Sequence, residues 1–306
     1  MYDLIIIGGG PAGTGAGVYA ARKRLKTLLL ADAFGGQSSV SAEIQNWIGT
    51  VAISGEDLAK SLKKHVEAYA GDVLSIHEER VNKIEKNDQG FNLTTEKGTY
   101  STRSILIATG SHRRRLEAIG ADTFEHKGLT YCASCDGPLY AGQDLVVVGG
   151  GNAAFETAAE LLAYAKSVTL IHRGADFLRA DSITVNKVLA LPNMRAIKNA
   201  VITEVKGGAF VNGLVYKDSA TGQTTELPIG GIFVEIGQLP NTEFVKDIVS
   251  LNEFNQIVID PRTQQTQTKG IWAAGDCTDV LYHQNNIAAG DAVRALEDIY
   301  KNLHTK

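Results

Sequence analysis

The stretch Leu4-Ile5-Ile6-Ile7-Gly8-Gly9-Gly10-Pro11-Ala12-Gly13 decides how the N-terminal part of this chain folds. Its short apolar run is predicted to be a buried strand, and the glycines that follow have the spacing G-x-G-x-x-G. We expect Gly8 to make a tight turn, Gly10 to let the backbone approach a pyrophosphate, and Gly13 to let a helix pack closely on the strand. The start of that helix would direct N–H groups and partial positive charge at the pyrophosphate.

The residues after this loop complete a βαβ unit. The predicted helix runs to about Lys23, and a second apolar strand, Leu25–Leu30, ends at Asp32. Asp32 lies nineteen residues beyond Gly13, where a carboxylate can accept hydrogen bonds from a ribose diol. The sequence therefore predicts a Rossmann-like dinucleotide-binding domain. Near the other end of the chain, Ala273-Ala274-Gly275-Asp276 places an acid after a strand of small residues, and together with the N-terminal motif this indicates FAD.

A second glycine-rich stretch, Gly149-Gly150-Gly151-Asn152-Ala153-Ala154, has the related spacing G-x-G-x-x-A. It follows the predicted strand Leu145–Val148 and opens a predicted helix to about Ala165, after which Val168–Ile171 forms the next strand. This strand ends in His172-Arg173 instead of an acid. Arg173 can neutralise a 2′-phosphate, which favours NADPH over NADH as the second dinucleotide.

Cys132-Ala133-Ser134-Cys135-Asp136 lies between the two glycine-rich stretches. A C-x-x-C pair in such a chain is typical of a disulfide that opens and closes through a thiolate. Zinc is the competing interpretation, but it needs about four ligands, and neither a second C-x-x-C nor an H-x-x-x-H accompanies the pair. No metal is expected. Asp136 is suited to carry the proton that thiol chemistry releases, although Asp-Gly-Pro is also ordinary turn chemistry.

Composition places further limits on function. The chain has 306 residues, 44% hydrophobic and 21% charged, which is typical of a soluble globular protein with two domains. A formal net charge of −4 argues against nucleic-acid binding. No apolar run reaches the roughly eighteen residues that would span a membrane, and no leader precedes the first strand, so we expect a cytoplasmic protein. Cys277, the third cysteine, is expected to be a buried apolar residue, with a resolving thiol as the alternative.

The remaining patterns suggest one nucleotide-binding plan used twice, with the second copy inserted in the first. The expected fold is α/β with two Rossmann-like domains of the three-layer ββα/βα type. Residues 1–112 plus 242–306 would bind FAD, and 113–241 would bind NAD(P)H and carry the dithiol. Further strands are predicted, together with a final helix; they are a hairpin at Phe91–Tyr100, Ser104–Ala108, Val201–Lys217, Gln223–Leu227, Gly231–Ile236, Ile257–Asp260, Ile271–Ala274 and the helix Ile287–Leu303. Arg113-Arg114-Arg115 falls on the first joint, as a solvated linker or as a docking patch for an acidic partner.

The chain resembles the low-molecular-weight thioredoxin reductases, and equally the reductase portion of the alkyl hydroperoxide reductase flavoprotein. The similar segments include Phe34-Gly35-Gly36-Gln37, Asn46-Trp47, Tyr131–Pro138, Gly237–Asn241 and Tyr282–Gln284, in addition to both glycine-rich stretches. The resemblance implies electron transfer from NAD(P)H through FAD to Cys132–Cys135 and then to a thioredoxin-like or other dithiol protein. It also implies a homodimer and a rotation of the inserted domain.

The resemblance assigns roles to individual residues. Cys132 would attack the protein substrate, Cys135 would lie nearest the flavin, and Asp136 would donate and accept the proton. The residues that would bind FAD are Gly8, Gly10, Pro11, Ala12, Gly13, Asp32, Gly36, Gln37, Asn46, Thr109, Gly110, Gly275, Asp276, Gln284 and Ile287. The residues that would bind NAD(P)H are Gly149, Gly151, Asn152, Ala153, Ala154, His172, Arg173 and Arg179.

Two departures from the family pattern leave the electron donor open. Gly174 stands where relatives have a second arginine, and Arg179 comes one residue late, so NADH remains an alternative to NADPH. A second hypothesis keeps the flavin and the dithiol but takes electrons from ferredoxin, or passes them to oxygen as a small-dithiol oxidase. A third is a redox or nucleotide sensor without turnover.

Overall fold

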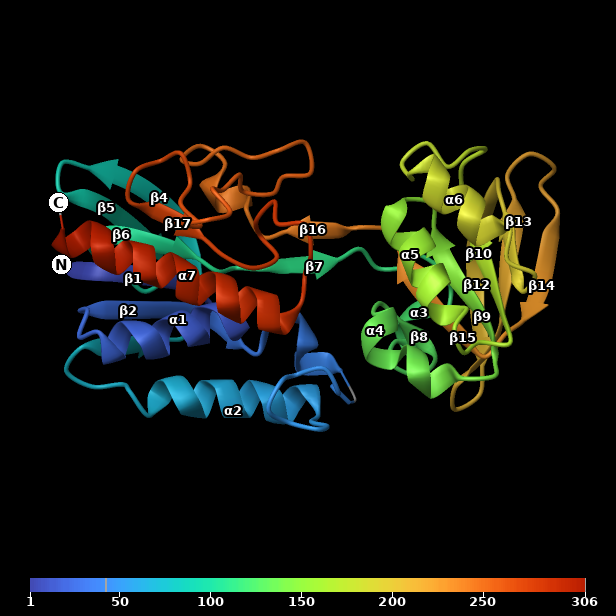
Figure 1. The fold of residues 1–306 in the computed structure, drawn as a ribbon, viewed down its shortest axis with the longest axis horizontal. Helices are drawn as coiled ribbons and strands as arrows, with labels where there is room; N and C mark the ends of the chain where they lie inside the picture. The colour runs from blue at the N-terminus through green and yellow to red at the C-terminus, as the bar shows by residue number, and fades with distance from the viewer. Residues whose placement is uncertain (42, 306) are drawn as a thin grey trace. The chain divides into compact units, whose positions relative to one another are not determined.

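The chain divides into two compact units. The structure, a computed structural model, describes residues 1–41 and 43–305. Unit 1 comprises residues 1–41, 47–112 and 239–306, and unit 2 comprises residues 42–46 and 113–238. Unit 2 is thus inserted in the sequence of unit 1, and each unit has a largely parallel sheet with helices (Figure 1). The predicted α/β fold class is confirmed.

Unit 1 is built on a seven-stranded sheet in the order β3-β2-β1-β6-β5-β4, with β17 paired to β6. The strands β1, β2, β3, β6 and β17 are parallel, and β4 and β5 add an antiparallel hairpin. Their bounds are β1 Tyr2–Gly9, β2 Thr27–Phe34, β3 Leu74–His77, β4 Val81–Asn87, β5 Gly90–Thr95, β6 Thr99–Ile107 and β17 Ile271–Ala273.

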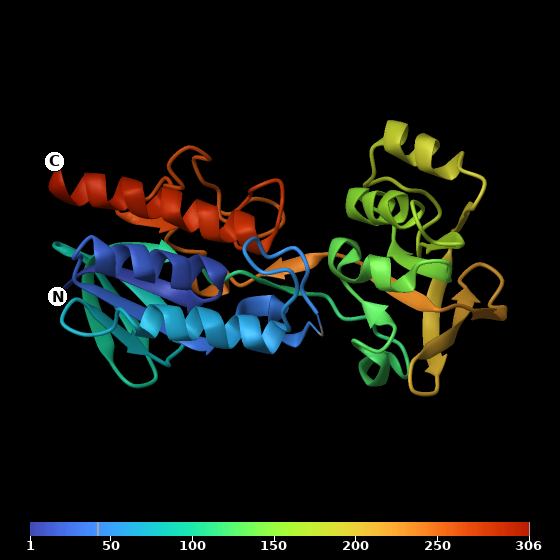
Figure 2. The same cartoon turned by 60° about the horizontal axis from the view of Figure 1, so that its bottom comes forward.

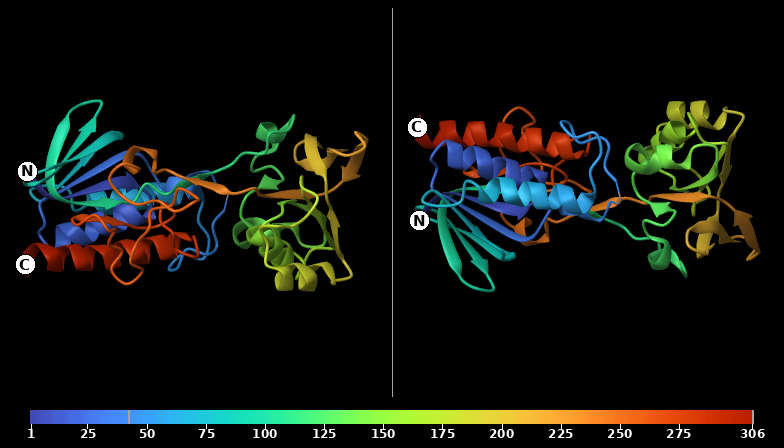
Figure 3. Two further views of the ribbon diagram at one scale, coloured as in Figure 1. Left: turned by 90° about the horizontal axis from the view of Figure 1, so that it is seen from above. Right: turned by 90° about the horizontal axis from the view of Figure 1, so that it is seen from below.

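Both faces of this sheet are covered, which explains why β1 is a continuous apolar run. Leu4 and Ile6 point to the face on which α1 and α7 pack, and Ile5 and Ile7 point to the other. Figure 2 shows α1, α2 and α7 together along the sheet, and in Figure 3 the teal β4–β5 hairpin curls away from α7. The helices and short 3-10 segments of unit 1 are α1 Pro11–Arg22, η1 Gly36–Val40, α2 Gly55–Glu67, η3 Glu243–Val245 and α7 Asn285–His304.

Unit 2 has a five-stranded parallel sheet in the order β11-β10-β9-β15-β8 and a three-stranded antiparallel meander, β12-β13-β14. One apolar cluster joins the sheet to α5 and the other joins it to the meander, so this sheet is also covered on both faces. The strands are β8 Leu129–Thr130, β9 Asp144–Gly149, β10 Ser167–Ile171, β11 Met194–Ile197, β12 Ala200–Gly207, β13 Val211–Asp218, β14 Thr224–Pro228 and β15 Gly231–Glu235. The helical segments are α3 Ala121–Phe124, α4 Ala133–Asp136, η2 Gly137–Tyr140, α5 Asn152–Leu161 and α6 Ser182–Leu189.

The two connections at the ends of residues 113–238 pair with each other. Strands β7 (Ser111–Arg113) and β16 (Gln238–Pro240) form a two-stranded sheet. The backbone N–H of Arg114 donates to the carbonyl of Gly237 at 3.1 Å, beside this pair.

Three details of the predicted elements were wrong. Residues 257–260 form no strand, because Ile257 and Ile259 make isolated bridges with different partners, Ile257 with Leu251 and Thr278 and Ile259 with Thr266. The hairpin and the strand predicted at Ser104–Ala108 share one continuous strand, β6. Helix α5 ends at Leu161, short of the predicted end at Ala165.

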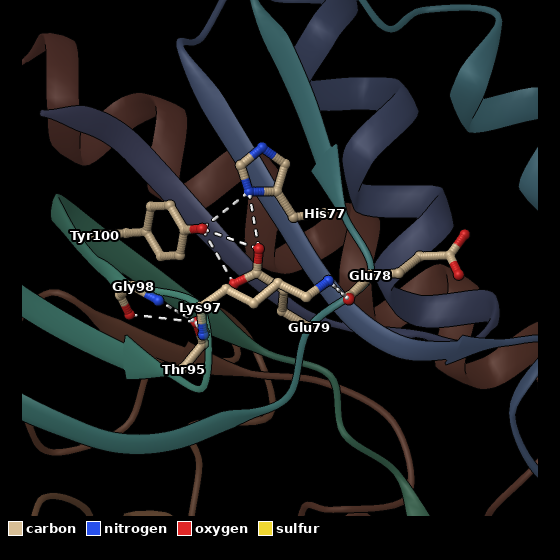
Figure 4. A network of polar contacts seen from close by, with 7 residues as sticks. All are labelled: His77, Glu78, Glu79, Thr95, Lys97, Gly98 and Tyr100. Atoms are coloured by element: carbon tan, nitrogen blue, oxygen red, sulfur yellow. Dashed lines mark hydrogen bonds and ion pairs between the residues drawn. The ribbon is translucent and has the colours of Figure 1, made fainter.

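A polar network ties the β3–β4 turn of unit 1 to the β5–β6 hairpin (Figure 4). The side chain of Glu79 is 7% exposed, and its carboxylate accepts hydrogen bonds from the Thr95 hydroxyl at 2.6 Å and the Tyr100 hydroxyl at 3.0 Å. His77 Nδ1 lies 3.5 Å from the same carboxylate. These hydrogen bonds lower the pKa of Glu79, with Thr95 as the largest cause.

Within the described residues, no helix combines the length and apolar character that crossing a bilayer requires.

Candidate functional site

The first glycine loop, Gly8–Gly13, packs tightly at two positions and leaves the third open. A Cβ at Gly8 would lie 2.2 Å from the carbonyl oxygen of Ala108, and a Cβ at Gly13 would lie 1.8 Å from that of Gly8. A Cβ at Gly10 would meet nothing nearer than Gly36 Cα at 3.7 Å. Gly10 caps α1 without a side-chain hydrogen bond, and the first turn carries no acid. The open space and the uncapped N–H groups fit a dinucleotide pyrophosphate.

Other predicted residues of unit 1 gather around this loop. Gly36, at φ 66°, has its Cα beside Gly10 at the start of η1. Gly275, at φ 77°, turns so that a Cβ there would lie 3.6 Å from Ala12 and 3.2 Å from Ala288 of α7. The loop, η1, the turn after β17 and the start of α7 therefore lie together.

Side-chain hydrogen bonds hold these segments in place. Gln37 Nε2 donates to the Ser111 hydroxyl at 3.0 Å. Asn285, the first residue of α7, donates from Nδ2 to the Ser38 hydroxyl at 2.9 Å. The next predicted segment, Thr109-Gly110, is held by Asn241: the Thr109 hydroxyl donates to the Asn241 carbonyl at 2.8 Å, and Asn241 Nδ2 donates to the Thr109 carbonyl at 2.9 Å.

The remaining predicted FAD residues are placed as follows. Asp32 is exposed near the end of β2, next to β1. Asp276 is partly buried in the turn after β17, and Gln284 caps α7 without a side-chain hydrogen bond to the helix. Ile287 lies in the first turn of α7. Asn46 differs from the others because it belongs to unit 2.

The second glycine loop, Gly149–Ala154, has a similar backbone but different neighbours. A Cβ at Gly149 would lie 2.4 Å from the carbonyl oxygen of Glu235, and one at Gly150 would lie 2.1 Å from Nδ1 of His172. Gly151 caps α5 without a side-chain hydrogen bond, and a Cβ there would meet only Arg179 O, at 3.7 Å. This loop also fits a pyrophosphate, and His172 is one wall of it.

The segment after β10 folds back over the second loop. Arg179 forms a backbone bridge with Gly151, and Asn152 Oδ1 accepts from the N–H of Asp181 at 2.7 Å. Phe177 anchors the segment, with its ring edge-on to Phe155 at 4.9 Å. Arg179 and Asn152 are therefore brought together.

The charges on this segment are of both signs. Arg173 is exposed directly after His172, and Arg179 is also exposed. Asp176, which was not predicted as a site residue, lies between them and forms an ion pair with Lys198 at 2.9 Å. The aspartate at 176 was visible in the sequence, but its pairing with a lysine from a later turn was not.

Cys132 and Cys135 form a disulfide in unit 2, with their Cα atoms 5.3 Å apart. Cys132 caps the single-turn helix α4, so the C-x-x-C spacing places both sulfurs on one turn. Ser134, between them, donates from its hydroxyl to Glu160 of α5 at 3.1 Å. Gly137 follows the pair because a Cβ there would lie 1.9 Å from the Tyr164 hydroxyl.

Asp136 lies beside the disulfide and is partly buried. Its carboxylate accepts a short hydrogen bond from the Thr130 hydroxyl at the end of β8. Burial raises the pKa of Asp136, and the opposing effects of Thr130, His126 and Arg113 are smaller. A carboxyl group that holds its proton to higher pH is suited to exchange protons with a thiol.

Glu235, near the second loop, was not predicted from the sequence as a site residue. Glu235 ends β15 beside Gly149, and its Oε1 accepts from the hydroxyl of Thr157 on α5 at 3.1 Å. Burial raises the pKa of Glu235 to about 7. The sequence does show an acid at the end of an apolar strand. That this strand lies beside the second glycine loop is known only from the strand order in the structure.

Cys277 is fully buried and its Sγ lies 3.5 Å from the carbonyl oxygen of Ala274, so the expected buried residue is what the structure shows. Burial raises its pKa to about 11, which makes it a poor resolving thiol.

Comparison with known proteins places this geometry in a family. Residues 2–293 match the family of pyridine nucleotide-disulphide oxidoreductases. The NADH dehydrogenase of Bacillus subtilis (strain 168) is 38% identical over 295 residues, which cover 96% of this chain and 57% of that protein. One subunit of the alkyl hydroperoxide reductase of Escherichia coli (strain K12) is 39% identical over 297 residues, with the same coverage. The chain thus spans little more than half the length of these relatives.

Solved structures extend the likeness over the whole chain. The thioredoxin reductase of Streptococcus pyogenes MGAS5005 is 34% identical, with a TM-score of 0.91, and covers 100% of this chain and 99% of its own. The thioredoxin reductase of Giardia duodenalis is 32% identical, with a TM-score of 0.93 and the same coverage. FAD and NAD(P)H, the two cofactors predicted from the sequence, are those that such enzymes use. With two pyrophosphate-shaped glycine loops and a closed C-x-x-C disulfide, this chain belongs to the pyridine nucleotide-disulphide oxidoreductase family.

Proposed function

We propose that this protein is an FAD-dependent disulfide reductase of the thioredoxin-reductase type, which uses NAD(P)H to reduce a thioredoxin-like protein. The observation that carries the proposal is the Cys132–Cys135 disulfide, with the raised-pKa carboxyl of Asp136 beside it, in the same unit as the second glycine loop. The relatives named thioredoxin reductase support the acceptor.

The two loops take different cofactors in this proposal. Residues 1–112 plus 242–306 would hold FAD, with the pyrophosphate at Gly10, the adenosine ribose at Asp32 and the flavin end at the start of α7. Residues 113–241 would hold NAD(P)H, with the pyrophosphate at Gly151. The acid-free first turn of α1 and the uncapped start of α7 support the first assignment. Asn46 remains a proposed FAD contact.

The sulfur chemistry follows from the positions of the two cysteines. FAD, when bound, supplies the electron pair that it receives from the nicotinamide. Two electrons break the Cys132–Cys135 bond, and two protons complete two thiols, one of them by way of Asp136. The Cys132 thiol then gives up its proton, and its thiolate attacks the disulfide of the acceptor, which forms a mixed disulfide and releases one acceptor thiolate that takes up a proton. Cys135 attacks Cys132 Sγ, restores the internal bond and releases the second acceptor thiolate.

The donor is proposed to be NADPH, with NADH as the alternative. Arg173 and Arg179 favour a 2′-phosphate, and the ion pair with Lys198 offsets the negative charge of Asp176. The name of the Bacillus subtilis relative includes NADH and supports the alternative. We further propose a cytoplasmic homodimer that binds neither nucleic acid nor membranes.

The test compares two half-reactions in the wild-type protein and in Cys135→Ser. Anaerobic mixing with NADPH or NADH should bleach the flavin absorbance of both proteins. Reduction of a thioredoxin should occur with the wild type and fall by roughly a thousandfold or more in Cys135→Ser, because the internal disulfide cannot form. Glu117→Gln, an exposed substitution in unit 2, is the control. Bleaching by neither nucleotide would instead favour a ferredoxin donor or a dithiol oxidase, and full activity of Cys135→Ser would remove the dithiol from the mechanism.

A further inference from the structure

The strand order of unit 2 shows where each half of a bound dinucleotide would lie. The sheet order is β11-β10-β9-β15-β8, and the glycine loop follows the central strand β9. In such sheets the dinucleotide crosses the carboxyl ends of the strands, with its adenosine ribose at the end of the strand that follows the loop helix. That strand is β10, which leads to Arg173. The nicotinamide half therefore lies on the other side of β9, over the end of β15.

Glu235 is the last residue of β15 and lies directly beside this position. In the parallel register of β15 with β9, Glu235 is opposite Gly149, the first glycine of the loop. The carboxyl group is mostly buried and accepts a hydrogen bond from the Thr157 hydroxyl at 3.1 Å. The register, the burial and the contact with α5 fix an ionisable group at the nicotinamide end of the crevice.

Resting on the function proposed above, we propose that Glu235 contacts the nicotinamide end of the dinucleotide and favours its oxidised form over its reduced form. The oxidised ring carries a positive charge and the reduced ring does not. A carboxylate a few ångströms away stabilises the cation and leaves the neutral ring nearly unaffected. Glu235 would thereby change the affinity for the oxidised dinucleotide, the product, relative to that for the reduced dinucleotide, the substrate. It would not change the affinity for both forms equally.

The charged groups around Glu235 determine when it is ionised. Arg113, from β7, favours the carboxylate, and Glu156 and Glu160, both on α5, oppose it. Burial is the largest effect, and the resulting pKa of about 7 puts the change of charge in the physiological range. The preference for the oxidised ring is therefore present above pH 7 and is lost as the pH falls below 7. By linkage, binding of the oxidised dinucleotide should lower the pKa of Glu235 and release protons near pH 7.

The test measures affinities in the oxidised FAD-loaded protein by calorimetry. The two probes are NADP⁺ and 1,4,5,6-tetrahydro-NADPH, whose ring is uncharged and cannot donate a hydride. Titration of the 2′-phosphate acts equally on both probes and cancels in the ratio of their dissociation constants. For the wild type, the dissociation constant of tetrahydro-NADPH divided by that of NADP⁺ should rise about tenfold between pH 6 and pH 8. The NAD⁺ and tetrahydro-NADH pair is measured in parallel.

Glu235→Gln should give a ratio that is independent of pH and no higher than that of the wild type at pH 6. Glutamine still accepts a hydrogen bond from Thr157, and a melting curve verifies folding. Glu226→Gln removes one carboxylate from β14 and should keep the wild-type pH dependence. The second measurement uses the wild type alone, in buffers of different ionisation enthalpy at pH 7: NADP⁺ should release more protons than tetrahydro-NADPH.

A pH dependence that persists in Glu235→Gln, or equal proton release with both probes, would overturn the role of Glu235 while leaving the disulfide reductase standing. Binding of neither probe pair would overturn the proposed nicotinamide function and this inference with it.

Discussion

The two glycine loops have nearly the same sequence pattern and opposite surroundings. The first is closed in by other segments of unit 1, namely η1, the turn after β17 and the start of α7. The second is lined by His172 against Gly150, by Glu235 beside Gly149, and by the segment after β10, which bridges to Gly151 at Arg179. The residue nineteen positions after the last loop residue is Asp32 in unit 1 and Arg173 in unit 2.

The difference in surroundings suits the two loops to different tasks, one to hold a cofactor permanently and the other to bind a dinucleotide that exchanges. A cofactor that stays bound benefits from several distant segments that converge on it, whereas a dinucleotide that enters and leaves benefits from a loop on which fewer segments converge. The acid at 32 suits a ribose diol and the arginine at 173 suits a phosphate. Variants at matched positions of the two loops can therefore separate the tasks.

The largest expected effect is that of Gly13→Ala. Its Cβ would lie 1.8 Å from the Gly8 carbonyl oxygen, so α1 cannot stay in place, and we expect a loss of stability of about 3 kcal/mol together with loss of FAD. Gly10→Ala, whose Cβ would lie in the open pyrophosphate space, should fold normally and lose FAD affinity alone. Melting curves and flavin absorbance after gel filtration distinguish the two. Retention of FAD by Gly10→Ala would place the pyrophosphate elsewhere.

Asp136→Asn should slow the reduction of disulfides and leave the binding of both cofactors unchanged. Without a carboxyl to exchange protons with the thiols, disulfide reduction should fall about a hundredfold while flavin bleaching by NAD(P)H is unchanged. The raised pKa of Asp136 keeps it protonated to higher pH, so the wild-type rate should decline as pH rises through that value, and the variant should lack this limb. Its melting temperature should not fall, because the ionised form is disfavoured by burial. Pre-steady-state traces from pH 5 to 9 test this, and an unchanged profile would leave Asp136 a turn residue.

Both glycine loops and the cysteine pair were predictable from the sequence because they depend on local patterns. The glycine spacings, the apolar runs before them and the C-x-x-C pair fix strand, turn and helix within about thirty residues each. The buried strand β1 reads as apolar throughout, as expected for a parallel sheet covered on both faces.

The parts that failed depend on contacts between distant segments. Residues 257–260 have strand-like alternation, yet Ile257 and Ile259 form isolated bridges with different partners. Glu235 becomes informative only once β15 is known to lie beside β9, and Asp176 only once Lys198 is known to neutralise it. The single-turn helix α4 that carries the cysteines was also beyond local pattern, because four residues give no periodicity.

Arg173→Ala tests whether the residue at the ribose end of the second loop binds a 2′-phosphate, as Asp32 is proposed to bind a ribose at the first loop. Removing one charged contact to a 2′-phosphate should raise the KM for NADPH about tenfold and leave that for NADH nearly unchanged. The matched variant Asp32→Ala should weaken FAD binding and leave both nicotinamide KM values as they were. Initial rates with each donor, at saturating FAD, measure both effects. Equal changes for NADPH and NADH in Arg173→Ala would show that no 2′-phosphate lies there.

The smallest effect is expected at the network around Glu79, which contains none of the predicted site residues (Figure 4). Tyr100→Phe removes the hydroxyl that donates to the Glu79 carboxylate at 3.0 Å, and we expect unit 1 to lose about 1 kcal/mol of stability at pH 7 with no change in turnover. Because the pKa of Glu79 is lowered in the folded protein, the network stabilises above the ordinary glutamate pKa, and this stability is lost as the pH falls through the lowered value. The difference between wild type and Tyr100→Phe should therefore shrink as the pH falls through the lowered pKa of Glu79. Thermal release of FAD, followed by flavin fluorescence, reports on unit 1, and the exposed Tyr19→Phe is the control. A difference that stays constant with pH would mean that Tyr100 contributes through packing of its ring, and that the carboxylate is not the group it stabilises.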